Sequence, residues 1–239
     1  MEKIFKKIIL LGRPASGKSE IINFLKNISY SERVNKYHIG KLVEIDDFPM
    51  LWTWFEEDDI LSKKFKKPRL HTTKDGYFKY KYLWHLLIER ISLDYYKYVR
   101  DNKRKLDEVT FLIEFSRGSE HGGYKEAFKH LSKQLLKDSA LLYVDVTFEE
   151  SLRKNRKRFN PDKPDSILEH GLPDKKLEKL YKNVDFHKLK KTKTHIKING
   201  IKVPYIIFNN MPSKTDDFKI LAPALKEVLD KLWSIYKYE

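Results

Sequence analysis

The segment from Gly12 to Ser19 has the residue types and the spacing of a phosphate-binding loop. Its sequence, GRPASGKS, is a complete G-x-x-x-x-G-K-[ST] motif that directly follows the apolar run at residues 8–11. The glycines allow backbone N–H groups to point inward around a phosphate, and the helix that follows adds partial positive charge. Lys18 is expected to contact the β- and γ-phosphates, and the Ser19 hydroxyl is placed to ligate Mg²⁺.

The residues on either side place this loop between a strand and a helix. Apolar side chains recur at i, i+3, i+4 and i+7 from Ile21 to Ile28, which predicts an amphipathic helix after the loop. This is the context that the motif requires, whereas an ordinary glycine-rich turn would bind no nucleotide. We therefore expect ATP as the ligand. Its expected contacts in this segment are Gly12, Ala15, Ser16, Gly17, Lys18, Ser19 and Glu20.

Two aspartates and a glutamate follow or end apolar runs that predict strands. Asp46 and Asp47 follow the run at 39–45, and such strand ends face the ligand in open α/β sheets. Asp46 and Asp47 are therefore candidates for contact with Mg²⁺ or the substrate, although an aspartate pair before a proline also starts turns and caps helices. Glu114 lies near the end of the buried strand at 109–115.

A charge on a central strand is costly to bury unless it serves a cation or a bound proton. Glu114 is therefore predicted to act on a Mg²⁺-bound water or to accept the proton of an attacking hydroxyl. A structural ion pair with Arg117 or Lys18 is the alternative. Arg117, in the loop after this strand, is expected to bind an anionic substrate through two parallel hydrogen bonds.

A cationic helix is predicted after the strand at 140–146, with Thr147 and Glu150 as its capping box. Arg153, Arg156 and Lys157 share one face of this helix, and Arg158 adjoins them. So close to the phosphate loop, this face is expected to stabilise charge during phosphoryl transfer, with Arg153 also touching the nucleotide. The alternative is a solvated basic helix.

Three further segments are expected to complete the site. Residues 48–105 form a substrate-binding insertion whose aromatic, acidic and basic blocks either stack a base and hold a phosphate or pack locally. The Pro- and Gly-containing loop around 153–175 is the expected lid. After a hairpin at Asn199-Gly200, the last strand leads to Asn210, which is expected to approach the nucleotide.

Composition limits the class of protein. The 239 residues are 41% hydrophobic and 13% aromatic, which predicts a single α/β domain. A formal charge of +15 favours anionic partners, nucleotides or nucleic acids, although dispersed lysines also raise solubility. The absence of cysteine excludes disulfides and thiolate metal sites, and no paired histidine spacing suggests a metal. With no long apolar stretch and no signal segment, we expect a cytoplasmic protein without a membrane partner.

The order of these motifs resembles the P-loop nucleoside and nucleotide kinases. The resemblance rests on GRPASGKS, Asp46-Asp47, EFSRG at 114–118, VDVTFEESLRKNRKR at 144–158 and IIFNN at 206–210. It implies a three-layer α/β/α fold with a parallel five-stranded sheet, a helical insertion and an arginine-bearing lid. It also implies Lys18 and Ser19 as phosphate and Mg²⁺ ligands, Glu114 and Arg117 as the acid and arginine pair, and Arg153 and Arg156 as lid arginines. In those kinases the arginine usually adjoins the acid, whereas here two residues intervene.

The sequence thus predicts a kinase that uses ATP and Mg²⁺ and phosphorylates a nucleoside, a nucleotide or a similar hydroxyl-bearing acceptor. The expected catalytic residues are Lys18, Asp46, Glu114, Arg117, Arg153 and Arg156, and the expected metal ligands are Ser19, Asp46 and Glu114. Either Asp46 or Glu114 would be the general base. A polynucleotide kinase or nucleic-acid-dependent NTPase is the alternative that the net charge supports, and a nucleotide-binding regulator without catalysis is a third. The oligomeric state is not predicted.

Overall fold

A six-stranded, mostly parallel sheet forms the centre of the computed structural model, which describes residues 4–159, 162 and 171–237. The strands follow the order β2-β3-β1-β4-β6-β5, and only the pairing of β5 with β6 is antiparallel. Their bounds are β1 Lys7–Gly12, β2 Lys41–Asp46, β3 Val109–Phe115, β4 Ser139–Asp145, β5 His195–Ile198 and β6 Ile201–Asn209. The chain is therefore an α/β protein, as expected, with five parallel strands and one more from the hairpin.

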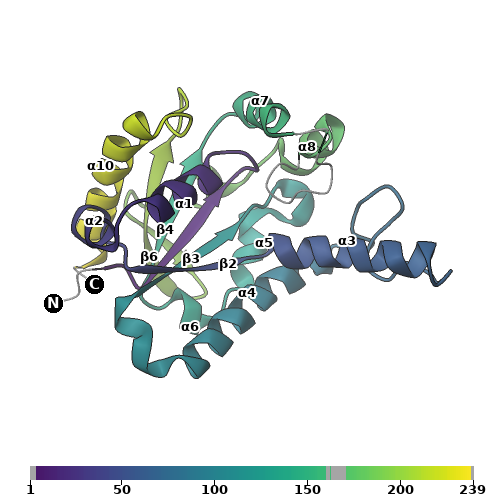
Figure 1. Ribbon diagram of the computed structural model, residues 1–239, viewed down its shortest axis with the longest axis horizontal. Helices are drawn as coiled ribbons and strands as arrows, with labels where there is room; N and C mark the ends of the chain where they lie inside the picture. Colours follow the sequence, from purple (N-terminus) through teal and green to yellow (C-terminus); the bar gives the residue numbers. More distant parts are fainter. Residues whose placement is uncertain (1–3, 160–161, 163–170, 238–239) are drawn as a thin grey trace.

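The helices cover both faces of this sheet (Figure 1). Their bounds are α1 Lys18–Asn27, α2 Tyr30–Glu32, α3 Phe48–Lys63, α4 Tyr82–Asp101, α5 Gly123–Lys129, α6 Lys133–Leu136, α7 Phe148–Arg158, α8 Asp174–Tyr181, α9 Phe186–Leu189 and α10 Phe218–Tyr236. A π-helical turn spans Arg33–Tyr37, and 3₁₀ turns span Lys103–Glu108 and Ser119–His121. Within the described ranges, no helix combines the length and apolar composition needed to cross a membrane.

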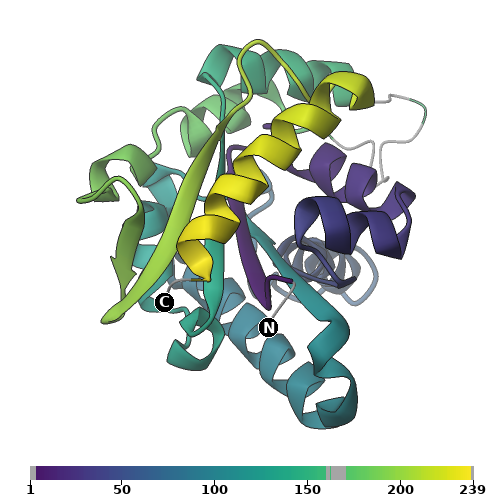
Figure 2. The same cartoon turned by 90° about the vertical axis from the view of Figure 1, so that its left-hand side faces the viewer.

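Alternation along β1 divides the core into two layers. Ile9 and Leu11 pack with α4 and α5, whereas Ile8 and Leu10 pack on the other face with α1 and α10. Figure 2 looks onto the face that α10 covers. Every residue of β1 is buried, as expected for a central parallel strand with helices on both sides. The loop after β1 therefore starts from a fully buried central strand.

Local signals predicted most element ends correctly. Thr147 caps α7 by accepting a hydrogen bond from the Glu150 N–H at 3.2 Å. Asn199 and Gly200 both have positive φ, as a two-residue type I′ hairpin turn requires. Between β3 and β4, α5 ends at Lys129 and Ser132 caps the separate α6. Between α7 and β5, the chain forms two separate helices, α8 and α9.

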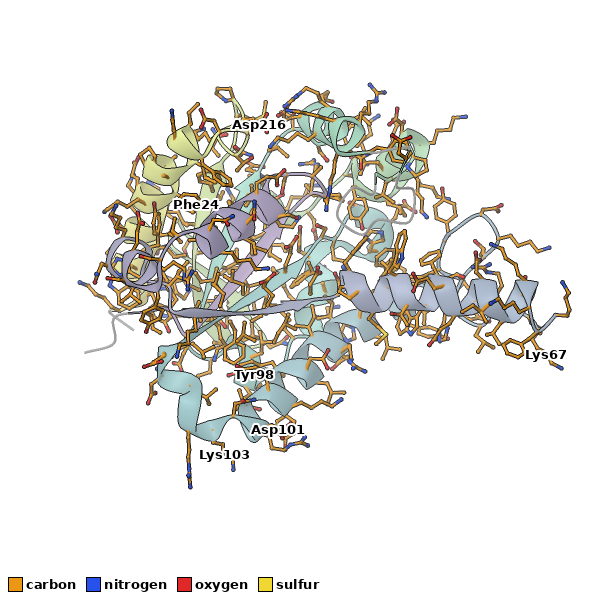
Figure 3. All side chains as sticks on the ribbon, in the orientation of Figure 1. Phe24, Lys67, Tyr98, Asp101, Lys103 and Asp216 are labelled. Atoms are coloured by element: carbon orange, nitrogen blue, oxygen red, sulfur yellow. The ribbon has the colours of Figure 1, made fainter. Side chains whose placement is uncertain are left out.

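The insertion at 48–105 is helical at both ends and irregular between them. Its first helix, α3, projects away from the sheet, and Figure 3 labels Lys67 just beyond the outer end of this helix. In the irregular part, His71 stacks on Trp54 at 5.0 Å, and Phe78 contacts the rings of Trp54, Phe55 and Trp84. Much of the aromatic cluster is therefore local core. The predicted lid lies in part outside the described residues.

Asp58 holds the irregular part of the insertion together. Its fully buried carboxylate accepts hydrogen bonds from the N–H groups of Leu70, His71 and Thr72 and from the Thr72 hydroxyl, at 2.6–2.9 Å. Burial opposes ionisation of Asp58, but these hydrogen bonds outweigh it and hold its pKa below the ordinary range. The loop that follows α3 therefore depends on one ionised side chain.

Replacing Asp58 with alanine should destabilise the protein by about 3 kcal/mol, because the N–H groups of Leu70, His71 and Thr72 lose their acceptor. Glu57→Ala is the matched control. Glu57 is an exposed acid on the same helix, and its loss should cost less than about 1 kcal/mol. Denaturant unfolding measures both effects, and hydrogen exchange at 70–72 detects local opening. Equal effects of the two substitutions would contradict this role for Asp58.

Lys7 is a buried lysine at the start of β1. Its Nζ lies 3.3 Å from the Tyr95 hydroxyl. The residue as a whole is 4% exposed. Burial lowers the pKa of Lys7 from 10.5 to about 8, despite the opposing charge of Asp138. The folded state therefore disfavours the charged form, and this cost is present in full below about pH 8 and disappears as the pH rises toward 10.5.

Lys7→Met should accordingly stabilise the protein by about 2 kcal/mol at neutral pH, because it removes a charge that burial penalises. The gain should shrink as the pH approaches 10.5, where the lysine is neutral in both states. Thermal unfolding of both proteins between pH 6 and pH 10 measures this difference. A loss of stability at pH 7, or a gain independent of pH, would show that Lys7 is stabilised by its contacts.

Candidate active site

The loop between β1 and α1 is packed too tightly for side chains at its two glycines. A Cβ on Gly17 would lie 2.6 Å from the Thr215 hydroxyl and 2.7 Å from the Asn210 amide nitrogen, and the φ of Gly17 is +111°. A Cβ on Gly12 would lie 2.7 Å from the Val144 carbonyl oxygen. The glycines thus let the loop close on the carboxyl ends of β4 and β6 and leave its N–H groups available at the start of α1.

Side chains from distant elements support the loop from behind. The Tyr124 hydroxyl bonds both the carbonyl and the N–H of Gly12, at 3.0 and 3.2 Å. The Ser151 hydroxyl donates to the Pro14 carbonyl at 2.7 Å. Sequence reasoning missed Tyr124 and Ser151, since a buried tyrosine and a mid-helix serine carry no motif that would single them out.

Asn210 has the same supporting role. It is fully buried, and its amide donates to the Ser16 carbonyl at 2.8 Å and to the Thr215 hydroxyl at 2.9 Å. Its oxygen accepts from the Lys214 N–H at 2.6 Å. Both ends of the Asn210 amide are therefore engaged within the protein, and its expected contact with the nucleotide stays a prediction.

Lys18 lies across the loop and reaches the end of β3. Its Nζ donates to the Arg13 carbonyl and to the Ser116 hydroxyl, both at 2.9 Å, and lies 3.6 Å from Glu114 Oε1. The residue is 5% exposed, yet it lines the large cavity described below. Ala15, Ser19 and Glu20 line the same cavity, whereas the Ser16 hydroxyl is buried without a hydrogen-bond partner. Of the loop residues expected to contact the ligand, Gly12 and Ser16 do not line this cavity, and the others do.

The expected acids are neighbours at the carboxyl ends of adjacent strands. Asp46 of β2 is in register with Glu114 of β3, and both line the cavity. Asp46 opens onto the cavity, but its place deep between protein walls raises its pKa to about 8, with the charges of Glu114 and Asp47 adding to the effect. Burial also raises the pKa of Glu114, although Lys18 opposes this. Burial and neighbouring negative charge thus disfavour the ionised forms of both acids, whereas the positive charge of Lys18 favours them.

Arg117 is engaged by the protein itself. Its guanidinium is almost fully buried and lies 2.6 Å from Asp47 Oδ2, and it donates to the carbonyls of Ser116 and Trp84 at 2.7 and 3.0 Å. The structural ion pair weighed for Glu114 is therefore formed by Lys18, while Arg117 pairs with Asp47. Arg117 still lines the cavity, but three groups of the wall already hold its guanidinium.

Of the three arginines of α7, two form ion pairs outside the cavity and one lines it. Arg153 pairs with Glu150 at 2.7 Å and Asp216 at 3.3 Å, and Arg156 pairs with Asp174 at 2.6 Å. Neither lines the cavity. Arg158 does, and its charge lowers the pKa of Glu114. The rotation of α7 thus brings its last arginine to the cavity, whereas Arg153 and Arg156 lie outside it and their roles stay predictions.

Lys18, Asp46, Glu114, Arg117 and Arg158 all line one cavity of about 1290 Å³. The loop at 12–19 forms one end, and the insertion together with α8 forms the other. That second end is aromatic and cationic: Lys176 lies 5.2 Å from the ring centres of Phe55 and Tyr77, and Lys179 lies 4.5 Å from that of Tyr77. Because a site for one small ligand is usually about 300–1,000 Å³, this volume allows two ligands side by side.

Comparison with known proteins adds little to this geometry. No protein-family model matches the chain, and no curated protein matches it. Among solved structures, the chain is similar to the crystal structure of APE1195, with 15% identity, a TM-score of 0.43, and coverage of 96% of this chain and 98% of that chain. It is also similar to the crystal structure of TT1252 from Thermus thermophilus, with 13% identity, a TM-score of 0.37, and coverage of 94% and 97%. Likenesses this weak carry no argument about activity.

Proposed function

We propose that this protein is a phosphotransferase of the P-loop kinase type, which transfers the γ-phosphoryl group of ATP to a nucleoside, a nucleotide or a similar hydroxyl-bearing acceptor. One observation carries the proposal: a single cavity holds the phosphate loop and Lys18 at one end, an aromatic and cationic wall at the other, and the Asp46–Glu114 pair beside Lys18. Phosphoryl transfer requires a donor site, an acceptor site and charged groups between them.

The oxygen ligands beside the loop suit Mg²⁺. Among the described residues, no three histidine, cysteine or acidic side chains form a metal site by themselves. Kinase sites of this class take most of their Mg²⁺ ligands from the nucleotide and water, so the Ser19 hydroxyl and one carboxylate, Asp46 or Glu114, suffice. The ion supplies charge neutralisation on the phosphates when bound.

The remaining roles follow from position. Lys18 is expected to contact the β- and γ-phosphates, and Arg158 adds positive charge at the same side of the cavity. Asp46 or Glu114 orients the acceptor hydroxyl and accepts its proton. At the far end, the rings of Phe55 and Tyr77 offer a stacking surface, and Lys176 and Lys179 offer charge for an anionic acceptor.

A phosphorylation assay with ATP, Mg²⁺ and a panel of acceptors tests the proposal. The panel contains nucleosides, nucleotides and oligonucleotides with a free 5′-hydroxyl, and labelled product is measured with ADP release. We expect transfer to at least one small acceptor. Transfer to oligonucleotide ends alone would favour the polynucleotide kinase alternative, and ATP hydrolysis that no acceptor accelerates would contradict phosphoryl transfer.

The formal charge of +15 favours some binding of nucleic acid, which the same assay leaves untested. Because the charge comes from dispersed lysines, this binding should be weak, independent of sequence and steeply weakened by salt. Fluorescence anisotropy with unrelated oligonucleotides at two salt concentrations measures it. Nanomolar affinity for one sequence at physiological salt would support the alternative instead.

A further inference from the structure

The outer face of α4 carries an apolar stripe that no described element covers. Tyr82, Leu86, Leu93 and Tyr96 are 58%, 47%, 44% and 49% exposed, respectively. With Glu89 between them they follow 4-3-4-3 spacing, which places them in one line along the helix. We call these five residues the outer stripe. The opposite face of α4 packs into the core, and Figure 1 shows this helix along the edge of the molecule.

An exposed face of this kind is unusual for a surface helix. The solvent side of an amphipathic helix is normally polar, and large apolar side chains gathered in a row mark a contact surface. On α10, by comparison, the only exposed large apolar residues in the described part of the chain are Phe218 and Ile220, at the start of the helix. The outer stripe instead extends over most of the length of α4.

The order of residue types along the stripe is the same in both directions. From Tyr82 the helix presents tyrosine, leucine, the charged neighbours Glu89 and Arg90, leucine, and then tyrosine at 96. A two-fold symmetric contact needs such a surface, because each residue i that meets j on the second copy requires j to meet i. A two-fold axis near 89–90 would bring Leu86 against Leu93 of the second copy. A different partner protein would impose no such symmetry.

The charges at the centre also complement each other under this symmetry. The axis that pairs the leucines places Glu89 beside Arg90 of the second copy. Within one chain, Glu89 contacts His130 at 2.9 Å and Arg90 contacts Asp94 at 3.0 Å. Glu89 and Arg90 are 56% and 40% exposed. Because exposed ion pairs of this kind contribute little to stability, both side chains can exchange their partners for those of a second copy.

We propose that two copies of this protein associate through the outer stripe, with their α4 helices antiparallel across a two-fold axis near Glu89 and Arg90. The contact would hold α4 from the side opposite the cavity. The carbonyl of Trp84, on the same helix, accepts a hydrogen bond from Arg117, so this association would also brace the wall of the candidate active site.

Light scattering combined with size-exclusion chromatography tests the association. At about 100 µM chain the native protein should be a dimer, since association in the micromolar range is then nearly complete. Leu93→Glu should raise the dissociation constant by about 100-fold or more, because the symmetry places each substitution in the contact twice. Ile220→Glu, at a residue 52% exposed on α10, is the control and should leave the dimer intact.

A cross-link tests the position of the axis. The chain has no cysteine, so a single introduced cysteine reports only on its own surroundings. Glu89→Cys should form a disulfide-linked dimer on mild oxidation, because a residue directly next to a two-fold axis comes within disulfide range of its own copy. Ile220→Cys should stay monomeric on a denaturing gel. A monomeric native protein, a dimer that Leu93→Glu does not weaken, or equal cross-linking of the two cysteines would overturn the proposal.

Discussion

Replacing Glu114 with glutamine should lower single-turnover phosphoryl transfer by about 10²-fold or more while nucleotide binding is retained. Glutamine keeps the shape of the side chain but removes the charge that lies 3.6 Å from Lys18 and beside Asp46. The amide of glutamine can neither hold Mg²⁺ as a carboxylate does nor take the proton from the hydroxyl of the acceptor. Rapid quench with the acceptor found in the panel measures this step directly.

Thermal unfolding of the same variant separates a catalytic from a structural role. If Glu114 serves only to neutralise the charge of Lys18, turnover should stay normal and the free energy of unfolding should fall, by roughly 3–5 kcal/mol for a fully buried pair. Asp46→Asn is the matched comparison, since Asp46 occupies the neighbouring strand position. A greater loss of rate in Asp46→Asn than in Glu114→Gln would assign the general base to Asp46.

Replacing Lys18 with alanine should weaken ATP binding and lower turnover by about 10³-fold or more, because it removes the ammonium group that lies across the loop. The fold should remain, since Tyr124, Ser151 and Asn210 hold the loop backbone independently of Lys18. Circular dichroism and thermal unfolding check that point.

Lys26 provides the control for Lys18. It also lines the cavity, but it is 51% exposed and pairs with Glu44 at 2.7 Å. Lys26→Ala should change ATP affinity by less than about threefold, because an exposed, paired lysine contributes little. If the two alanine variants lost ATP affinity equally, the cavity would act through its net charge rather than through the loop lysine.

The β1-loop-α1 unit and the meeting of the acids at the ends of β2 and β3 could be predicted from the sequence. The β1-loop-α1 unit follows from an apolar run, a glycine motif and helical spacing within twenty-two residues. The approach of Asp46 to Glu114 follows from topology, since parallel strands end at one edge of a sheet. Their pKa shifts then follow from burial and mutual repulsion.

Other features depend on packing that no short pattern encodes. Whether Arg153 or Arg158 faces the cavity depends on how α7 is rotated against the sheet, and a difference of five residues changes the face. The pairing of Arg117 with Asp47 requires the loop after β3 to meet the end of β2. The hydrogen bonds of Asn210 to Ser16 and Lys214 were not predictable either, because sequence indicates that a residue is near a loop but not which of its atoms are already bonded.

Calorimetric titration of ATP with Mg²⁺ into the native protein tests the central claim most directly. The account predicts one ATP bound per chain, competition by ADP, and loss of most of the affinity in Lys18→Ala while Lys26→Ala binds normally. No binding of ATP at millimolar concentration, or the same affinity in the native protein and in Lys18→Ala, would contradict the claim that the loop at 12–19 holds the phosphates of a nucleotide.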